Sequence, residues 1–345
     1  MPRLALPDFL QTDANGPVLD VRAPVEYAQG HIPGAVSFPL FTDDERARIG
    51  TTYKQQSQDK AVLLGLDLFG PRMSQMVKLA GKIAPDKQVR VHCWRGGMRS
   101  GAVQWLLELA GFRVQLLDKG YKDYRRWALA EFEQPRAMWV LGGLTGSGKT
   151  DVLHALAAQN QPVLDLEGLA AHKGSAFGSI GQPEQPTQEQ FENDLAARLA
   201  ALPAETPFWV EDESRGIGRV AVPGGLFEQL RTAPLVVLEI PREVRVAKLA
   251  DEYGRQDPAA LAASVLRIRK RLGGLATKEA LAAIGGNDME KMVSLVLDYY
   301  DKTYSHGLDG RPFVRVPSHT CDPVVNAGLV LAAAQASFPA EARRG

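Results

Sequence analysis

The sequence predicts two α/β domains in tandem, the second being a phosphate-loop domain with a helical C-terminal part. Short apolar segments of strand length alternate with longer helical patterns, which is typical of mostly parallel sheets. This alternation stops and restarts near Gln134 and Pro135. A chain of 345 residues, 45% of them hydrophobic, is long enough to form two cores. We therefore expect one domain over residues 5–133 and another over residues 136–325.

The first domain alternates predicted strands and helices. Apolar segments typical of buried strands occupy residues 17–22, 34–40, 87–93 and 113–120. Helical periodicity covers residues 73–84 and 100–111, and a glycine ends the second helix.

The second domain repeats this alternation and then becomes helical. Its predicted strands occupy residues 137–143, 161–168, 207–214 and 233–241, and a helix is expected from about residue 149. Thr187 begins another helix, with Gln190 at the spacing of a capping box. After residue 241 we expect helices alone, including one that begins at Asp257-Pro258 and ends at Gly273-Gly274.

Composition narrows the classes of protein that remain. Forty basic and forty acidic residues cancel, so any surface for nucleic acid must be a local patch. Two cysteines exclude a disulfide scaffold, and the isolated Cys321 is expected to be structural. The first ten residues do not resemble a signal peptide, and the longest apolar run, residues 327–334, is too short to span a bilayer. We expect a cytoplasmic protein without a membrane partner.

The segment "VHCWRGGMRSG" (91–101) places a cysteine between a predicted strand and a predicted helix. Backbone N–H groups in such a loop, the helix N-terminus and fixed arginine charge would lower the pKa of the thiol and bind an oxyanion. We therefore predict Cys93, Arg95 and Arg99 as catalytic residues. The accompanying oxyanion loop is expected to include Trp94, Gly96, Gly97, Met98 and Ser100. A buried structural cysteine is the alternative.

Residues 8–132 resemble the rhodanese domain. The resemblance rests on this loop and on "DVRAPVEYAQGHIPGAVSFP" (20–39). It implies that Cys93 carries a chalcogen and that Asp20 and Arg22 brace the sheet edge. Five residues separate Cys93 from Arg99, whereas common rhodaneses have four, and the longer spacing resembles phosphatases that use a cysteine nucleophile. A wider loop has room for a tetrahedral phosphate-like group.

"GLTGSGKT" (143–150) fits the phosphate-loop pattern Gly-x4-Gly-Lys-Thr. It lies between a predicted strand and a predicted helix, as the motif requires. The predicted phosphate-binding residues are Gly143, Gly146, Ser147, Gly148, Lys149 and Thr150. Lys149 would neutralise phosphate, and Thr150 could hold Mg²⁺. Glu211, Asp212 and Glu213 end a later strand and are candidates to face a metal, although a solvated strand end is an equal alternative.

Three further segments have two interpretations each. The loop in "LEGLAAHKGSAFG" (166–178) follows a strand, and strand ends line ligand crevices in parallel sheets. It suggests a second site with His172, Lys173 and Ser175, together with Asp212, Glu213 and Arg215, although a solvated loop fits equally. "KGYKDYRRW" (119–127) suits RNA contact or packing between domains. "RIRKR" (267–271) suits RNA contact or the dipole at a helix end.

The order of the two domains resembles the tRNA 2-selenouridine synthase family. The resemblance rests on the segments "HCWRGGMRSGAVQWLL", "GLTGSGKT", "LEGLAAHKGSAFG" and "VEDESRGIG". The resemblance implies a transferase acting on wobble uridine 34 of the tRNAs for lysine, glutamate and glutamine. It implies geranyl diphosphate and selenophosphate as substrates and no tightly bound cofactor. It also suggests the selenophosphate-producing enzyme as a partner.

The same resemblance implies a mechanism with two loops. The sulfur of 2-thiouridine would attack geranyl diphosphate, with the departing diphosphate held by the phosphate loop. Cys93 would then take selenium from selenophosphate as a selenyl sulfide, and geranyl thiol would leave the ring carbon. The alternatives are an ATP-dependent, kinase-like enzyme fused to a sulfur carrier, a non-catalytic RNA-binding module, and a cysteine phosphatase.

Overall fold

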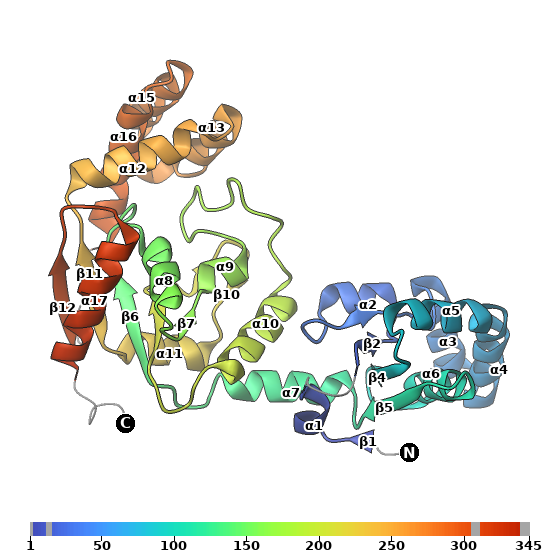
Figure 1. Cartoon of the computed structure of the whole chain (residues 1–345). Coiled ribbons are helices and arrows are strands. Elements are labelled where there is room, and N and C mark those ends of the chain that lie inside the picture. The colour runs from blue at the N-terminus through green and yellow to red at the C-terminus, as the bar shows by residue number, and fades with distance from the viewer. Residues whose placement is uncertain (1–2, 12–15, 305–310, 339–345) are drawn as a thin grey trace. The chain divides into compact units, whose positions relative to one another are not determined.

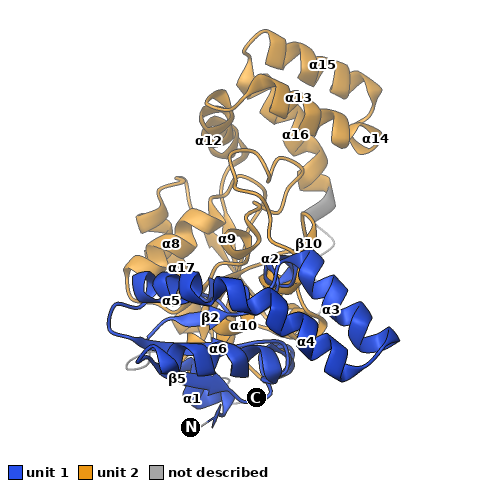
Figure 2. Cartoon of the chain, turned by 90° about the vertical axis from the view of Figure 1, so that its right-hand side faces the viewer, with its two compact units in different colours: residues 1–130 blue, residues 131–345 orange. Residues whose placement is uncertain are grey.

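The computed structural model describes residues 3–11, 16–304 and 311–338. It divides the chain into two compact units, residues 1–130 and residues 131–345 (Figure 2). Each unit contains a five-stranded sheet whose paired strands run parallel. The predicted fold class, two successive α/β units, is therefore confirmed.

The sheet of the first unit has the strand order β1-β5-β4-β2-β3. Its strands are β1 (Arg3–Leu4), β2 (Val18–Asp20), β3 (Val36–Ser37), β4 (Gln88–His92) and β5 (Arg113–Leu117). β4 lies at the centre of this sheet, paired with β2 on one side and β5 on the other. The segment that follows β4 therefore emerges at the middle of the carboxyl edge of the sheet, where parallel α/β folds bind ligands.

The first unit has more helices than the sequence analysis predicted. They are α1 (Leu6–Leu10), α2 (Pro24–Gln29), α3 (Asp43–Gln55), α4 (Gln58–Phe69), a 3₁₀ turn (Gly70–Arg72), α5 (Met73–Ile83), α6 (Met98–Leu109) and α7 (Tyr121–Glu131). The antiparallel pair α3 and α4 was missed (Figure 2). Its signals are N-caps: Thr42 accepts a hydrogen bond from the backbone of Glu45, and Ser57 accepts one from Lys60.

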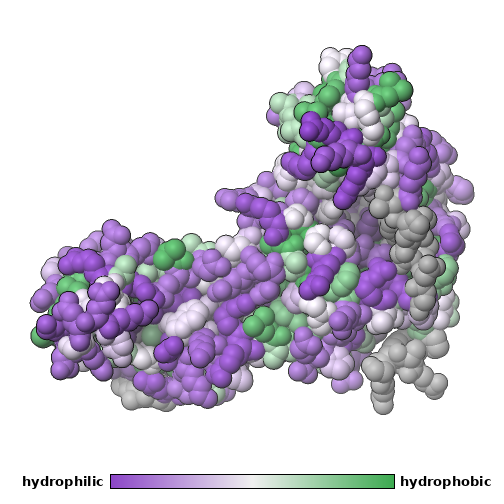
Figure 3. Space-filling model, turned by 180° about the vertical axis from the view of Figure 1, so that it is seen from behind, coloured by the Kyte–Doolittle hydropathy of each residue, from purple (hydrophilic) through white to green (hydrophobic). Residues whose placement is uncertain are grey.

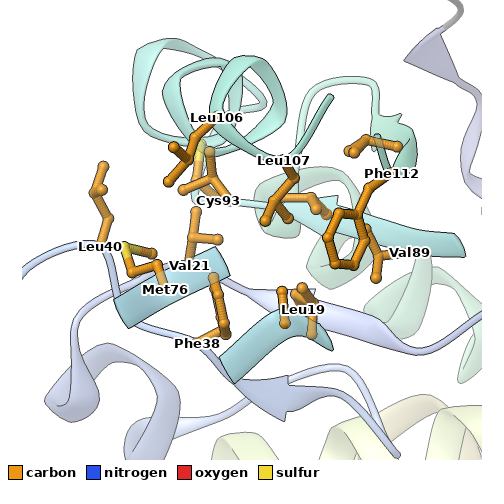
Figure 4. Packing of buried hydrophobic residues seen from close by; sticks show 14 of the residues in the cluster. Leu19, Val21, Phe38, Leu40, Met76, Val89, Cys93, Leu106, Leu107 and Phe112 are labelled. Atoms are coloured by element: carbon orange, nitrogen blue, oxygen red, sulfur yellow. The ribbon is translucent and has the colours of Figure 1, made fainter. Parts of the chain in front are cut away.

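The two faces of β4 differ in polarity. Val89 and Val91 belong to an apolar cluster that also contains Cys93, and Figure 4 shows Val89 and Cys93 in it. Because side chains alternate along a strand, Arg90 and His92 point to the other face. On that face, the ring of His92 and the guanidinium of Arg90 both lie near the ring of Phe9. Burial lowers the pKa of His92 to about 4, so this histidine is neutral.

The sheet of the second unit has the order β12-β11-β6-β8-β7. Its strands are β6 (Met138–Gly142), β7 (Val163–Leu164), β8 (Phe208–Glu211), β11 (Leu235–Glu239) and β12 (Phe313–Pro317). A separate antiparallel pair is formed by β9 (Gly216–Ile217) and β10 (Val220–Ala221). The prediction that only helices follow residue 241 was wrong, since β12 is an edge strand. Only Val316 is fully buried in it, so its apolar pattern is weak.

The helices of the second unit fall into two groups. Around the sheet lie α8 (Lys149–Ala158), α9 (Leu166–Ala170), α10 (Gln188–Ala201), α11 (Gly224–Thr232) and α17 (Pro323–Ser337). A helical group follows β11 (Figure 1), namely α12 (Arg242–Gly254), α13 (Pro258–Arg267), α14 (Arg269–Leu272), α15 (Gly274–Gly285) and α16 (Met289–Tyr304). α8 and α17 pack side by side, and their apolar residues cover one face of the sheet.

Most predicted strands are shorter in the structure, and two differences in boundary have a clear local cause. The helix that begins at Asp257-Pro258 breaks at Ile268, and the short α14 then continues to Gly273. The strand predicted over residues 161–168 ends at Leu164, because Asp165 caps the next helix by accepting a hydrogen bond from Gly168. This early helix start determines where Glu167 lies.

One face of the molecule is shown in Figure 3. Hydrophilic residues predominate on it, and apolar residues form small scattered groups. Within the described ranges, none of the helices has the length and apolar character needed to cross a membrane.

A buried ion pair supports the edge of the first sheet. Arg22 and Asp20 are fully buried, and the guanidinium donates to both carboxylate oxygens, at 3.0 and 2.6 Å. The same group donates to the carbonyl oxygen of Gly30 at 2.6 Å and lies 3.7 Å from the ring centre of Tyr121. The predicted bracing role of this pair has a direct structural basis.

We expect Arg22→Met to destabilise the first unit by about 3–5 kcal/mol, because it leaves the Asp20 carboxylate buried without its partner. Urea unfolding followed by circular dichroism measures the change. Arg48→Met, on the exposed side of α3, is the matched control and should cost less than about 0.5 kcal/mol. Equal stability of the two variants would contradict the bracing role.

Candidate active site loops

Cys93 lies directly after β4, at the start of the loop that leads into α6. Its side chain is almost fully buried. Its Sγ lies 3.2 Å from Oγ of Ser100, in the first turn of α6. The hydroxyl of Ser100 also lies 3.1 Å from the carbonyl oxygen of Gly97, so its one proton can point to that oxygen when Cys93 is a thiol and to the sulfur when Cys93 is a thiolate. The loop therefore folds back so that the helix N-terminus is directed at the thiol.

Several groups compete in setting the acidity of Cys93. Burial disfavours the thiolate and by itself would raise the pKa. Hydrogen bonds from the side chain and backbone of Ser100 and from the backbone of Arg95, together with the charge of Arg99, outweigh burial. The net result is a pKa below the usual value for cysteine. A lower pKa increases the fraction of Cys93 in the thiolate form, which is the nucleophilic form of cysteine.

The turn between β5 and α7 holds the cysteine loop in place. The backbone N–H of Tyr121 donates to the carbonyl of Cys93 at 2.9 Å, and that of Lys122 donates to Trp94 at 3.0 Å. Gly96 has a left-handed conformation, with φ of 64°, and a Cβ there would lie 2.8 Å from the carbonyl oxygen of Leu117. Only glycine fits at this close approach.

The predicted residues of the cysteine loop differ in where their side chains lie. Ser100 faces the thiol, and Trp94 leans on Tyr121 with ring centres 5.7 Å apart. Arg95 and Met98 are exposed, and Gly97 is the residue before α6.

Arg99 has a protein partner that the sequence analysis missed. It donates to the carboxylate of Glu26 at 2.6 and 3.4 Å, and Arg46 lies 3.5 Å from the same carboxylate. The only sequence signal for Glu26 was its place in the Glu-Tyr pair of the rhodanese-like string. A bound anion at this loop would therefore share Arg99 with Glu26.

The predicted phosphate loop connects β6 to α8. Gly148 precedes the helix in a left-handed conformation with φ of 80°, and a Cβ there would lie 2.7 Å from Nζ of Lys248. Lys149 donates to the carbonyl oxygen of Gly143 at 2.9 Å, so its side chain crosses the loop. Ser147 is buried, and its hydroxyl has no partner among the described residues. The loop thus offers backbone N–H groups and a lysine to a phosphate.

Three glutamates lie behind the phosphate loop. Thr150 Oγ1 donates to Glu167 at 2.7 Å, and the backbone N–H of Glu167 donates to Glu211, also at 2.7 Å. Burial, reinforced by the charges of Asp165 and Glu167, raises the pKa of Glu211 well above its usual range. Burial and the charge of Glu167 raise the pKa of Glu213 to about 8, against the opposing charge of Lys149. A protonated carboxyl carries no negative charge, so Glu211 and Glu213 repel a phosphate at the loop less than two carboxylates would.

The side chains of the predicted second site do not form a single cluster. A Cβ on Gly174 would lie 2.5 Å from Glu213, so the loop between His172 and Ser175 presses on this carboxyl. Asp212 instead receives a hydrogen bond from Arg311 at 2.8 Å, because alternate residues at the end of β8 point to opposite faces.

The remaining residues of the predicted second site point elsewhere. Lys173 pairs with Glu252 of α12, and Arg215 is exposed. His172 is buried and near Glu167, with burial lowering its pKa. Glu167 was not predicted as a functional residue, although its place directly after a strand was a usable signal.

The described residues contain no group of three or more histidine, cysteine, aspartate or glutamate side chains arranged to hold a metal ion. Cys321, expected to be structural, has its Sγ 3.9 Å from the carbonyl oxygen of Gly146 in the phosphate loop. Burial raises the pKa of Cys321, so it is a poorer nucleophile than Cys93.

The fold and these loops define a class: a rhodanese-like unit with a nucleophilic thiol, followed by a phosphate-loop unit. Two family models match, a rhodanese-like domain over residues 6–126 and the tRNA 2-selenouridine synthase AAA domain over residues 136–317. The chain belongs to the tRNA 2-selenouridine synthase family. It is thus a tRNA-modifying enzyme, a transferase.

Similar proteins agree with this assignment. A tRNA 2-selenouridine synthase from Bdellovibrio bacteriovorus is 36% identical over 88% of this chain and 93% of its own. One from Nitrosomonas europaea is 39% identical over 76% of this chain and 69% of its own. A tRNA 2-selenouridine synthase from Hydrogenovibrio crunogenus is 41% identical over 75% of this chain and 77% of its own. A solved N-terminal domain of an ATP/GTP binding protein from Clostridium difficile 630 covers 37% of this chain and 99% of its own, at 33% identity. The TM-score of this match is 0.35.

We expect Ser100→Ala to raise the pKa of the Cys93 thiol, because the variant loses the side-chain hydrogen bond that favours the thiolate. Alkylation by iodoacetamide, followed against pH in a Cys321→Ser background, measures the shift. The rate at neutral pH should fall severalfold. Ser74→Ala, on α5, is the matched control. A profile unchanged by Ser100→Ala would show that the backbone alone sets the acidity.

We expect Glu213→Gln to stabilise the second unit more at pH 8 than at pH 5. The folded protein keeps the Glu213 proton up to about pH 8, whereas the unfolded chain loses it near the usual value of 4.5. The free energy of unfolding therefore falls as pH rises through this window. The glutamine amide of the variant does not ionise, so the variant keeps its free energy of unfolding over this pH range.

Thermal unfolding followed by tryptophan fluorescence measures this effect, since Trp139 and Trp209 are buried in the same unit. The control is Glu228→Gln, on the exposed side of α11. It should leave the pH dependence unchanged. A constant difference between Glu213→Gln and the natural protein at both pH values would exclude a raised pKa.

Proposed function

We propose that this enzyme converts 2-thiouridine at wobble position 34 of tRNA to 2-selenouridine through an S-geranyl intermediate. Geranyl diphosphate and selenophosphate would be its substrates. The observation that carries the proposal is the presence, in one chain, of two separate sites suited to phosphate compounds. One is the phosphate loop at Lys149, and the other is the thiol loop at Cys93. Membership of the tRNA 2-selenouridine synthase family supports the overall reaction.

The phosphate loop would serve the geranyl transfer. The sulfur of thiouridine attacks the first carbon of geranyl diphosphate, a carbon–sulfur bond forms, and the carbon–oxygen bond to diphosphate breaks. Negative charge grows on the departing diphosphate, and Lys149 and the N–H groups around Gly146 and Gly148 can stabilise it. The protonated carboxyls near the loop add no repulsion at this stage.

Mg²⁺ is compatible with this site, because the ion commonly binds one carboxylate and substrate phosphates. Thr150 and Glu167 are the residues that would hold it. The described residues contain no larger set of metal ligands, so phosphate oxygens of the substrate would supply the other ligands.

The thiol loop would serve the selenium step. Selenium in selenophosphate is at the level of selenide, so a selenyl sulfide on Cys93 would require a two-electron oxidation. Attack of the Cys93 thiolate on phosphorus needs no oxidant. The sulfur–phosphorus bond forms, the phosphorus–selenium bond breaks, and selenide is released. Selenide then adds to the ring carbon, geranyl thiol leaves, and water hydrolyses the phosphorylated cysteine.

We extend the proposal to the tRNAs for lysine, glutamate and glutamine, read at their anticodon loops, and to the cytoplasm as the place of action. The selenophosphate-producing enzyme is the proposed partner, because selenophosphate must be supplied continuously. These specifics rest on the family resemblance.

Nucleoside mass spectrometry tests the proposal. The protein is incubated with a thiolated lysine tRNA, first with geranyl diphosphate and then with selenophosphate. We expect Lys149→Ala to slow geranylation by about 10²-fold, the usual effect of losing one group that stabilises developing charge. We expect Cys93→Ser to form the geranylated nucleoside but no selenouridine.

The control variants are Cys321→Ser and Lys278→Ala, the latter on the exposed side of α15. Both should retain both steps. Folded natural protein that leaves thiouridine unchanged would overturn the proposal, and turnover that requires ATP would favour the kinase-like alternative.

A further inference from the structure

The first unit contains an apolar pocket that the proposed chemistry leaves unused. Its volume is about 430 Å³, within the range of small-molecule sites. Its walls are the α3–α4 hairpin on one side and the first turn and a half of α6 on the other. No local pattern in the sequence indicates a pocket here, because its walls come from segments that meet only in the folded unit.

The floor of the pocket is hydrocarbon. Leu40, Phe41 and Phe69 are buried there, and Ile49 and Val62 line the sides. Leu40, Phe41 and Phe69 belong to the same buried cluster as Cys93. The pocket is therefore an open extension of the apolar core beside the thiol.

The mouth of the pocket is basic. Arg46, Lys54 and Arg99 line it along with the apolar residues. Glu26 is the acidic partner of both arginines. An apolar interior with cations at the entrance suits an apolar chain attached to a negatively charged body, such as a lipid-modified polynucleotide.

One turn of α6 joins the pocket to the cysteine loop. Met98, Arg99 and Ala102 line the pocket, whereas Ser100 contacts the thiol sulfur. The pocket and the thiol therefore contact adjacent faces of the first turns of α6. A ligand whose chain occupies the pocket would have its head group near the anion loop.

We propose that this pocket binds the terpenyl chain of the S-geranyl nucleoside during the selenium step. The inference rests on the proposed function, which creates a tRNA with a ten-carbon chain on the wobble base. The chain in the pocket would direct the ring carbon toward the loop where selenide is released. The rhodanese-like unit would then select geranylated over unmodified tRNA.

The test measures how strongly chain length affects binding. The probes are two anticodon stem-loop RNAs that differ only in S-geranyl or S-methyl on the thiouridine. Fluorescence anisotropy with the full-length protein gives both dissociation constants. We expect the natural protein to bind the geranyl RNA at least tenfold more tightly than the methyl RNA.

Two variants fill the pocket from opposite walls, Val62→Trp on α4 and Ala102→Leu on α6. Each should reduce the preference for geranyl to near unity while leaving binding of the methyl RNA unchanged. The matched control is Leu63→Trp, since Leu63 is the next residue of α4 and is 62% exposed. It should keep the full preference. Circular dichroism confirms that each variant folds.

The outcomes separate this inference from the proposed function. Equal binding of both RNAs by the natural protein, or a preference that both filling variants retain, would overturn the pocket assignment. Preferential binding of the geranyl RNA that is lost in both variants supports it, whether or not turnover occurs. Natural protein that shows this binding but never forms selenouridine would overturn the proposed function alone.

Discussion

Both units depend on one constraint, the short connection from a buried parallel strand to the helix that follows it. Within six residues or fewer the backbone must turn and direct its N–H groups inward, which favours glycine at the tightest points. Gly96 and Gly148 both have left-handed conformations, and at Gly96 the backbone around Leu117 also leaves no room for a Cβ. The same geometry that reverses the chain therefore creates the positive potential that a thiolate or a phosphate requires.

Burial favours the protonated form behind both loops, but the net pKa shifts have opposite signs. At Cys93, hydrogen bonds and Arg99 overcome the cost of burying charge, so the pKa falls. At Glu211 and Glu213, burial and neighbouring carboxylates act together, so both pKa values rise. The result is a more acidic thiol in the first unit and less acidic carboxyls near a lysine in the second. This division suits nucleophilic attack in one unit and stabilisation of a leaving diphosphate in the other.

Support for these loops comes from groups that take no part in the chemistry. The Arg22–Asp20 pair lies beneath Tyr121, and the backbone of Tyr121 holds the carbonyl of Cys93. Glu26 accepts a hydrogen bond from Arg99 of the cysteine loop. It also pairs with Arg46, which lines the apolar pocket. A small set of polar contacts thus links the sheet edge, the anion loop and the pocket.

The sequence by itself determined the two α/β units, the cysteine loop and the phosphate loop, because each depends on local spacing of apolar residues, glycines and charges. It also located the carboxyls after β8 but could not separate Asp212, which turns to Arg311, from Glu213, which faces Lys149. Tertiary structure alone decided the pairing of Arg99 with Glu26, the approach of Glu167 to Thr150, and the pocket between α4 and α6. These contacts join segments between 17 and 73 residues apart, and such distances depend on how the elements pack, which no local pattern records.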